Sequence, residues 1–202
     1  MKKTATPHCA ACEAKTCREG KDCFETADEH RKAYEQARLA KVHRAASAIE
    51  ARHYCKEPRL AETILFAREL GCRKVGLAFC IGLSEEAKVV ERLLSEHFEV
   101  VSVCCKVSGI EKEEFGLERI RPSGREVMCN PAGQADLLNR ASTELNIICG
   151  LCVGHDAIFA MRSDAPVTTL VAKDRVLAHN PLGAVYCPYV RRNFANSENA
   201  SK

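Results

Sequence analysis

The sequence predicts an α/β protein with a Rossmann-like three-layer architecture. We expect a parallel sheet of four to five strands, preceded by two helices and a cysteine-rich metal-binding segment. Short apolar runs rich in Val, Ile and Cys alternate with segments of helical periodicity from residue 74 onward. Their strand–helix–strand spacing is that of right-handed parallel βαβ units. The first 26 residues differ, because apart from four cysteines and Phe24 they contain almost no apolar side chains.

Composition limits the classes of function. A chain of 202 residues can form one domain with a sizeable core and a small appendage. A net charge of +3 and 5% aromatic residues argue against nucleic-acid binding. No apolar run is long enough to span a membrane, and no signal peptide is recognisable, so the expected location is the cytoplasm. In a reducing cytoplasm, the 13 cysteines are more often ligands, redox groups or buried thiols than structural disulfides.

The strongest motif is the N-terminal Cys9-x2-Cys12-x4-Cys17-x5-Cys23. Thiolates this close together repel one another unless a cation neutralises them, and metal binding would supply folding energy that the segment otherwise lacks. A 4Fe–4S cluster and a zinc ion held by four cysteines both fit. The first three cysteines, Cys-x2-Cys-x4-Cys, resemble cluster-binding modules of anaerobic corrinoid and electron-transfer proteins, whereas the nearness of Cys23 keeps zinc as an alternative. The remaining alternative is four free thiols in a disordered tail.

The rest of the chain divides into predicted elements in order. Residues 27–53 and 59–70 form a helical pair, within a segment 27–71 that packs on the α/β domain of residues 72–192, and residues 193–202 form a disordered tail. Polar residues 106–125 form a long loop over the ligand edge of the sheet, with a short helix around 112–115. Strands are predicted at 74–80, 99–105, 146–149 and 166–172, with helices at 84–97, 132–144 and 156–161.

Cysteines recur where predicted strands end. Parallel strands bring their carboxyl ends to one edge of a sheet, which is where α/β proteins hold their ligands. Cys129 belongs to the same edge, because Asn130 and Pro131 after it are a good N-cap and first residue of a helix. A second metal or cluster site, a redox dithiol and inert buried thiols are the three interpretations. The predicted cofactor-binding set is Cys80, Cys105, Cys129, Cys149 and Cys152.

His155 is the candidate catalytic residue. It follows Cys149-x2-Cys152 and precedes Asp156, so it can act as an acid or base oriented by Asp156, serve as a metal ligand, or simply begin the next helix. The nearby glycines lack the GxGxxG spacing, so a dinucleotide site is not expected.

Three stretches together resemble a known family. They are the four N-terminal cysteines, LCVGHDAIF at 151–159 and APVTTLVAKDRVLAHNPLGAVY at 165–186. These resemble the cysteine-rich proteins of domain-of-unknown-function family 1847, found largely in anaerobic microbes. The resemblance implies metal binding without naming a reaction. It favours an iron–sulfur cluster over zinc, because anaerobes tolerate oxygen-sensitive clusters.

Three functions follow from these residues. The first is redox chemistry or electron transfer with a partner protein. The second is enzymatic, in which a cluster held by three cysteines leaves one iron open to a small-molecule substrate while His155 moves protons. The third is a non-catalytic zinc or redox sensor. Whether the protein is an enzyme, and its oligomeric state, are left open by the sequence.

Overall fold

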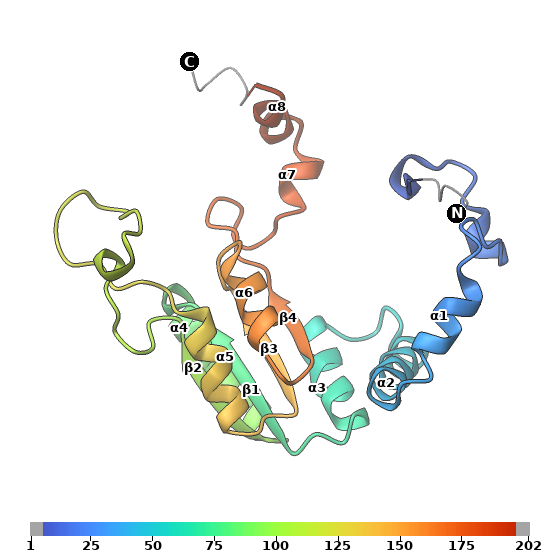
Figure 1. The fold of residues 1–202 in the computed structure, drawn as a ribbon, viewed down its shortest axis with the longest axis horizontal. Helices are drawn as coiled ribbons and strands as arrows, with labels where there is room; N and C mark the ends of the chain where they lie inside the picture. Colours follow the sequence, from blue (N-terminus) through green and yellow to red (C-terminus); the bar gives the residue numbers. More distant parts are fainter. Residues whose placement is uncertain (1–5, 197–202) are drawn as a thin grey trace. The chain divides into compact units, whose positions relative to one another are not determined.

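The computed structural model describes residues 6–196 and contains two compact units, which meet in the sequence between Tyr54 and Cys55. The N-terminal unit holds two short 3-10 helices and two α-helices (Figure 1). Their bounds are η1 Cys9–Ala11, η2 Thr16–Glu19, α1 Ala27–Ala33 and α2 Ala37–His53.

The single helix predicted over residues 27–53 is wrong, because the chain breaks between α1 and α2. Gln36 is extended and precedes the first residue of α2. The break allows the rings of Tyr34 and His43 to stack with centroids 4.5 Å apart. In a continuous helix, nine residues would separate them by about 13.5 Å along the axis. The ring contact therefore accompanies a turn that helical periodicity does not reveal.

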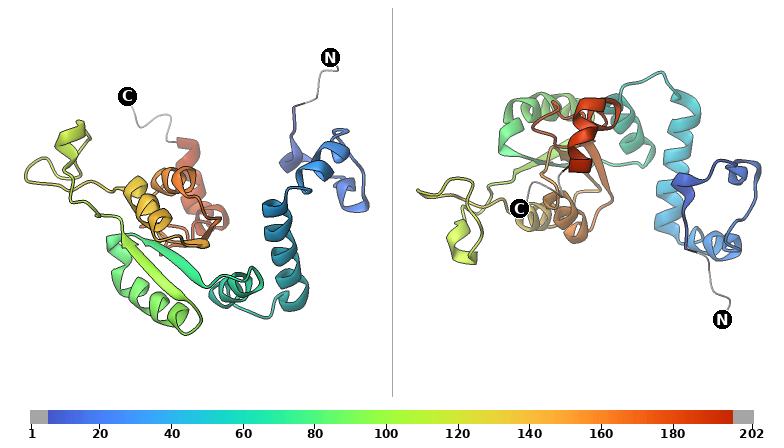
Figure 2. Two further views of the ribbon diagram at one scale, coloured as in Figure 1. Left: turned by 60° about the horizontal axis from the view of Figure 1, so that its bottom comes forward. Right: turned by 90° about the horizontal axis from the view of Figure 1, so that it is seen from above.

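The C-terminal unit contains a four-stranded parallel sheet in the order β2-β1-β3-β4, which confirms the Rossmann-like prediction. The helices α5 and α6 contact each other on one face of the sheet and α4 covers the opposite face (Figures 1 and 2). The strands are β1 Lys74–Phe79, β2 Glu99–Cys104, β3 Leu145–Cys149 and β4 Val167–Val171. The helices are α3 Arg59–Glu69, α4 Ser84–Ser95, α5 Pro131–Arg140, α6 His155–Arg162, α7 Gly183–Tyr186 and α8 Pro188–Asn196, with 3-10 turns η3 Ile81–Leu83 and η4 Lys112–Phe115.

The core lies around the central strand β3, which is buried at every position. Large side chains from both helical layers are fully buried, including Leu94 of α4, Leu138 of α5 and Phe159 of α6. Burying each such side chain contributes about 1.5–3 kcal/mol. The helix α3 is held at the outer strand, where Arg59 Nε donates to the Thr169 carbonyl oxygen at 2.6 Å.

The strand order places a switch point between β1 and β3. From β1 the chain moves outward to β2, and it then crosses back over β1 to β3. In open parallel sheets, ligands bind outside the carboxyl ends of the strands at such a reversal. Cys80 follows β1 and Cys149 ends β3, and the Cys80 amide donates to the Cys149 carbonyl oxygen at 3.2 Å. The strand-end cysteines therefore lie at the position where this fold holds ligands.

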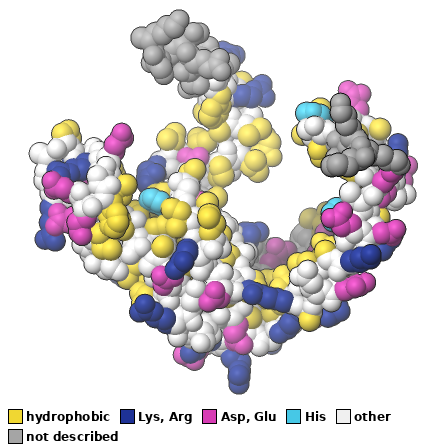
Figure 3. Space-filling model, in the orientation of Figure 1, with side chains coloured by type: hydrophobic (Ala, Val, Ile, Leu, Met, Phe, Trp, Pro, Cys, Tyr) yellow, Lys and Arg dark blue, Asp and Glu magenta, His cyan; other side chains and the backbone are white. Residues whose placement is uncertain are grey.

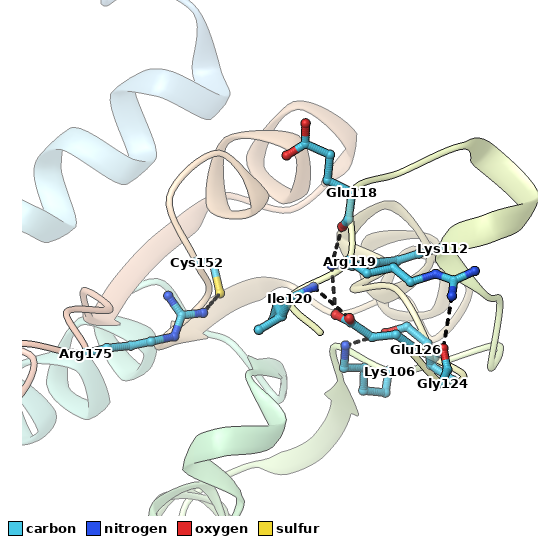
Figure 4. Close-up of polar contacts among 10 residues, drawn as sticks. Lys106, Lys112, Glu118, Arg119, Ile120, Gly124, Glu126, Cys152 and Arg175 are labelled. Carbon is cyan, nitrogen blue, oxygen red and sulfur yellow. Dashed lines mark hydrogen bonds and ion pairs between the residues drawn. The ribbon is translucent and has the colours of Figure 1, made fainter. Parts of the chain in front are cut away.

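The long loop over residues 106–128, called the arm below, is internally braced (Figure 4). Its short helix η4 begins with a capping box formed by Glu111 and Glu114. Lys112 pairs with Glu126 at 2.8 Å, and the Ile120 amide donates to Glu126 Oε2 at 2.8 Å. The arm begins directly after Cys105 and ends directly before Cys129, so its closure brings these two cysteines together.

The C-terminal helices extend further than the tail prediction suggested. The helix α8 continues through Asn196, into the segment predicted to be disordered from residue 193, and residues 197–202 lie outside the described part of the chain.

Hydrophobic side chains gather over α7 in Figure 3, where Leu182, Val185 and Tyr186 are exposed. Within residues 6–196, none of the helices combines the length and apolar character that crossing a membrane requires.

Candidate functional site

All four predicted N-terminal ligands line one hollow of about 530 Å³ in the N-terminal unit. The turn η1 begins at Cys9, and the Cys12 amide closes it by donating to the Cys9 carbonyl oxygen at 3.2 Å. Cys17 lies in η2, and Cys23 follows at the opposite end of the segment. The structure thus brings together the four thiols that the spacing singled out.

The segment around this hollow has little packing of its own. No side chain in residues 6–36 is buried, so packing contributes little to the stability of this segment. The Cys17 and Cys23 thiols donate to the nearby carbonyl oxygens of Lys15 and Lys21, at 3.7 and 3.9 Å. In the part of the chain that the structure describes, no group of three or more His, Cys, Asp or Glu side chains is arranged to hold a metal ion. The N-terminal thiols therefore line a space instead of meeting at one point.

A second group of thiols, called the triad below, lies at the sheet edge and consists of Cys80, Cys105 and Cys129. The Cys105 thiol lies close enough to the Cys80 and Cys129 thiols to shift the pKa of each, and Cys105 Sγ accepts a hydrogen bond from the Ile81 amide at 3.3 Å. Cys80 and Cys105 are buried, and Cys129 is half-buried. These three residues come from the end of β1, the end of β2 and the start of α5, so only the tertiary fold unites them.

Backbone hydrogen bonds fix the positions of the triad. The Cys105 amide donates to the Phe79 carbonyl oxygen at 2.9 Å, which extends the β1–β2 pairing by one residue. The Asn130 amide donates to the Cys105 carbonyl oxygen at 2.8 Å and closes the base of the arm. The Asn130 side chain accepts from the Gly133 amide at 2.8 Å, which confirms Asn130 as the N-cap of α5.

The surroundings of the three thiols shift their pKa values in opposite directions. The hydrogen bond from Cys105 lowers the pKa of Cys80, and the Lys173 ammonium, whose Nζ lies 3.0 Å from Cys80 Sγ, lowers it further. The same kind of bond from Cys105 lowers the pKa of Cys129, assisted by the charges of Lys106 and His155. The neighbouring Cys129 and Cys80 sulfurs, together with burial, raise the pKa of Cys105. Hydrogen bonding to the ionised form is the general reason for such lowering.

Two of the predicted sheet-edge cysteines, Cys149 and Cys152, lie outside the triad. Cys149 is fully buried, and burial, followed by the charges of Glu86 and Cys80, raises its pKa to about 11. Cys152 is half-buried and its Sγ accepts a hydrogen bond from Arg175 Nη2 at 2.8 Å (Figure 4). Hydrogen bonds among cysteine sulfurs thus join three of the five predicted residues.

His155, the predicted catalytic residue, is the first residue of α6. Its amide donates to the Cys152 carbonyl oxygen at 2.9 Å. Its charge acts on Cys129, which brings it into the electrostatic neighbourhood of the triad.

Three cationic residues of the sheet edge were not predicted as part of the site: Lys106, Lys173 and Arg175. Lys106 follows Cys105 directly, and its Nζ donates to the Val127 carbonyl oxygen at 2.6 Å across the base of the arm. Lys173 and Arg175 follow β4. Residues that follow parallel strands share one edge of the sheet, and this rule predicted the position of the cysteines. Applied to the residues after β4, the same rule would also have predicted these cations at that edge.

Replacing Asn130 with alanine is expected to lower the free energy of unfolding by about 1–2 kcal/mol. The reason is that one side chain both caps α5 and contacts the arm, so both interactions are lost together. Asn130 Nδ2 also contacts Ser108 Oγ at 3.4 Å on the arm. Urea denaturation measures the change, and Asn130→Asp is the control because aspartate retains the capping oxygen. Equal loss in both variants would show that capping is not the cause.

The fold and site together define a doubly wound α/β protein with a thiol cluster at its switch point. The chain belongs to the family described as protein of unknown function (DUF1847), whose profile matches residues 18–170. It is 48% identical over 185 residues to "Uncharacterized protein MJ0455" of Methanocaldococcus jannaschii, covering 90% of this chain and 94% of that protein. No solved structure gives a significant match. The family match includes the triad and Cys23, whereas Cys9, Cys12 and Cys17 precede it.

Proposed function

We propose that this protein binds iron–sulfur clusters at two places, the N-terminal four-cysteine hollow and the sheet-edge triad, and uses them in redox or cluster-dependent small-molecule chemistry. The observation that carries the proposal is the N-terminal hollow, which all four predicted thiols line. Cysteine thiolates are the usual ligands of 4Fe–4S clusters. At the sheet edge, Cys80, Cys105 and Cys129 come from segments that meet at the switch point.

The shape of the N-terminal site favours a cluster over a single ion. Zinc requires its four sulfurs about 2.3 Å from one point. A cubane cluster holds one thiolate at each of four iron corners, so its ligands stand around a volume. Cys9, Cys12, Cys17 and Cys23 surround a hollow of about 530 Å³ in this way.

At the triad, the residues of the chain would provide ligands, charge and proton handling. The lowered pKa values of Cys80 and Cys129 favour the ligating thiolate form, and Cys105 would release its proton when a metal binds. A bound cluster would supply electron transfer or a Lewis-acidic iron. Hydrogen bonds to cluster-ligating sulfurs tune the reduction potential, so the contact from Lys173 to Cys80 would be one determinant of it. His155 stands near Cys129 as a candidate acid or base.

The proposal is tested by measuring iron, zinc and acid-labile sulfide, with a visible spectrum, on protein purified without oxygen. Two 4Fe–4S clusters would give brown protein with about eight irons and eight sulfides per chain. Colourless protein with about one zinc per chain would contradict the cluster proposal. It would instead support the alternative of a zinc-binding sensor, which the short spacing between Cys17 and Cys23 keeps open.

Cys105→Ser is expected to lose about half of the bound iron, because one triad ligand is removed while the N-terminal set stays intact. Cys104→Ser is the matched control: Cys104 is the adjacent residue, half-buried in β2, and lies outside the triad's hydrogen bonds. Iron and sulfide analysis of both variants measures the difference. Equal iron content in the two variants would contradict cluster binding at the triad.

A further inference from the structure

Two exposed surfaces of the C-terminal unit carry apolar side chains and opposite charges. The first, called the arm tip below, is residues 113–120 of the arm, and the second, called the α7–α8 surface below, is residues 182–192. We infer that the partner of both is a second copy of this chain: the arm tip of each copy binds the α7–α8 surface of the other, and two copies form a closed dimer. This inference goes beyond the proposed function and does not depend on a bound metal.

Large apolar side chains are exposed on both surfaces (Figure 3). On the arm tip, Phe115 is 64% exposed and Ile120 is 83% exposed. On the α7–α8 surface, Tyr186 is 75% exposed and Tyr189 is 77% exposed. Exposed apolar side chains that gather on one surface mark an interaction site, and aromatic residues are enriched at the centres of protein interfaces.

The arm tip carries carboxylates without a cationic partner. Glu113 is paired with Arg119 at 2.7 Å, whereas Glu114 accepts the Glu111 backbone amide at 2.9 Å in the capping box. The Glu118 side chain points away from the ion pairs that brace the arm (Figure 4). In the described part of the chain, the carboxylates of Glu114 and Glu118 form no ion pair. Two negative charges are therefore available to a partner.

The α7–α8 surface has the opposite charge. No acidic residue occurs in the sequence between Asp174 and Glu198, and α8 contains Arg191 and Arg192. Among the described residues, neither guanidinium has a carboxylate partner, and Arg192 Cζ lies 5.4 Å from the centroid of the Tyr189 ring. Two unpaired carboxylates on the arm tip thus match two unpaired guanidinium groups on the α7–α8 surface. Such complementarity selects the partner and its orientation.

The sheet places the two surfaces where they can pair reciprocally. The arm follows β2, and α7 and α8 follow β4, which are the two outer strands of the order β2-β1-β3-β4. Because all four strands are parallel, both surfaces rise from the same edge of the sheet, at its opposite ends (Figure 1). A second copy related by a twofold rotation, with its edge facing this one, brings its α7–α8 surface to the arm tip and its arm tip to the α7–α8 surface.

A fixed turn holds the α7–α8 surface in place. Asp174 Oδ1 accepts from the Val176 and Leu177 amides at 2.9 and 2.8 Å, and the His179 amide donates to the Asp174 carbonyl oxygen at 2.9 Å. Ala178 and His179 both have left-handed φ angles, of 50° and 62°. Strained backbone of this kind persists only where the surrounding contacts fix it. The surface is therefore preorganised and loses little conformational freedom on binding.

The pairing would also cover the edge of the sheet between the two surfaces. Ile81 after β1, Val153 after β3 and Val176 after β4 are exposed there, Val153 at 90%. The three exposed aromatic side chains of each copy would together bury on the order of 800 Å² in the dimer. Stable interfaces bury about 1,200–2,000 Å² in total, so the aliphatic side chains of the two surfaces and of the edge would supply the remainder.

The inference is tested by sedimentation equilibrium of the whole chain, without oxygen and with a reductant that prevents cross-links between exposed cysteines. We expect a mass of twice the 22.3 kDa of one chain above about 10 µM, falling toward the mass of one chain on dilution. High salt should weaken the dimer, because it screens the charged contacts. The mass of a single chain at every concentration would overturn the inference.

Charge reversals identify the two contacts. Arg192→Glu and Glu118→Arg each place like charges at both contacts of their own dimer, so each should raise the dimer dissociation constant at least about tenfold. Mixed in equal amounts, the two variants should regain a dimer of wild-type stability, because each contact then joins opposite charges. Lys88→Glu is the matched control for the change in charge, because Lys88 lies on α4 and forms a surface ion pair with Glu85 at 2.7 Å.

A second variant tests the apolar part of the contact. Tyr186→Ser should also raise the dissociation constant at least about tenfold, because exposed aromatic side chains dominate the energetics of interfaces. Circular dichroism should show that it remains folded, since Tyr186 is exposed in the single chain. Tyr54→Ser is the control, because Tyr54 is an exposed tyrosine outside both surfaces.

Two further results would overturn the inference. A dimer that none of these variants weakens would use another surface. Loss of the dimer in Arg192→Glu but not in Glu118→Arg would mean that the arm tip does not bind the α7–α8 surface. None of these outcomes depends on metal content, so each leaves the proposed function to its own test.

Discussion

Cys17→Ser is expected to lose the N-terminal cluster, about four irons per chain, together with the order of the surrounding segment. The reason is that residues 6–36 have no buried side chain, so few interactions other than metal ligation can hold their fold. Domains of this kind fold only with their metal, and the binding free energy is then folding free energy. The C-terminal unit has its own core around β3 and should remain folded.

Iron and sulfide analysis combined with limited proteolysis measures this effect. Cleavage within residues 6–36 should become rapid in Cys17→Ser, while the C-terminal unit stays resistant. Cys55→Ser is the control, because Cys55 is an exposed thiol outside the hollow. If Cys17→Ser kept both its metal and its resistance to protease, the N-terminal site would not be a metal site.

Gly76→Ala is expected to lower the free energy of unfolding by about 3–5 kcal/mol, through overpacking and a disrupted polar network. A Cβ atom at residue 76 would lie 2.2 Å from Asn146 Oδ1 and 2.8 Å from Leu138 Cδ1, and both neighbours are fully buried. Asn146 cannot move freely, because its Oδ1 accepts from Thr143 and its Nδ2 donates to Ser163, each at 2.7 Å. The added methyl group therefore has to displace a hydrogen-bonded buried amide.

Urea denaturation monitored by circular dichroism measures the loss. Gly183→Ala is the matched control, because a Cβ there would make only an ordinary contact of 3.6 Å with Leu177 Cδ1. In the double variant Gly76→Ala with Asn146→Ala, the steric loss caused by Asn146 should disappear while the contact with Leu138 remains, so the two effects should not be additive. Unchanged stability of Gly76→Ala would contradict the close packing of β1 against β3.

Local patterns in the sequence predicted most of the architecture. Apolar runs located all four strands to within one or two residues, and the Asn130-Pro131 pair marked the start of α5. The short helix expected around residues 112–115 is η4 Lys112–Phe115. These features depend on neighbouring residues, on side-chain periodicity and on caps, so the printed sequence contains them directly.

Other features were missed because they depend on residues far apart in the chain. The break between α1 and α2 accompanies a ring contact between Tyr34 and His43, which helical periodicity does not signal. Lys173 lies 93 positions from Cys80 in the sequence, yet its Nζ is 3.0 Å from the Cys80 sulfur. Only the strand order brings the loop after β4 to the end of β1.

By itself, the sequence determined a parallel α/β protein with four clustered N-terminal thiols and further thiols at strand ends. It placed those strand-end thiols at one edge, because all parallel strands end on the same side of a sheet. Only the tertiary structure decided which of them meet. The order β2-β1-β3-β4 and the closure of the arm join Cys80, Cys105 and Cys129, while the register turns Cys149 to the opposite face and Arg175 holds Cys152. The physical reason is that strand order and register are set by packing of the whole core, whereas periodicity within one segment specifies only that segment.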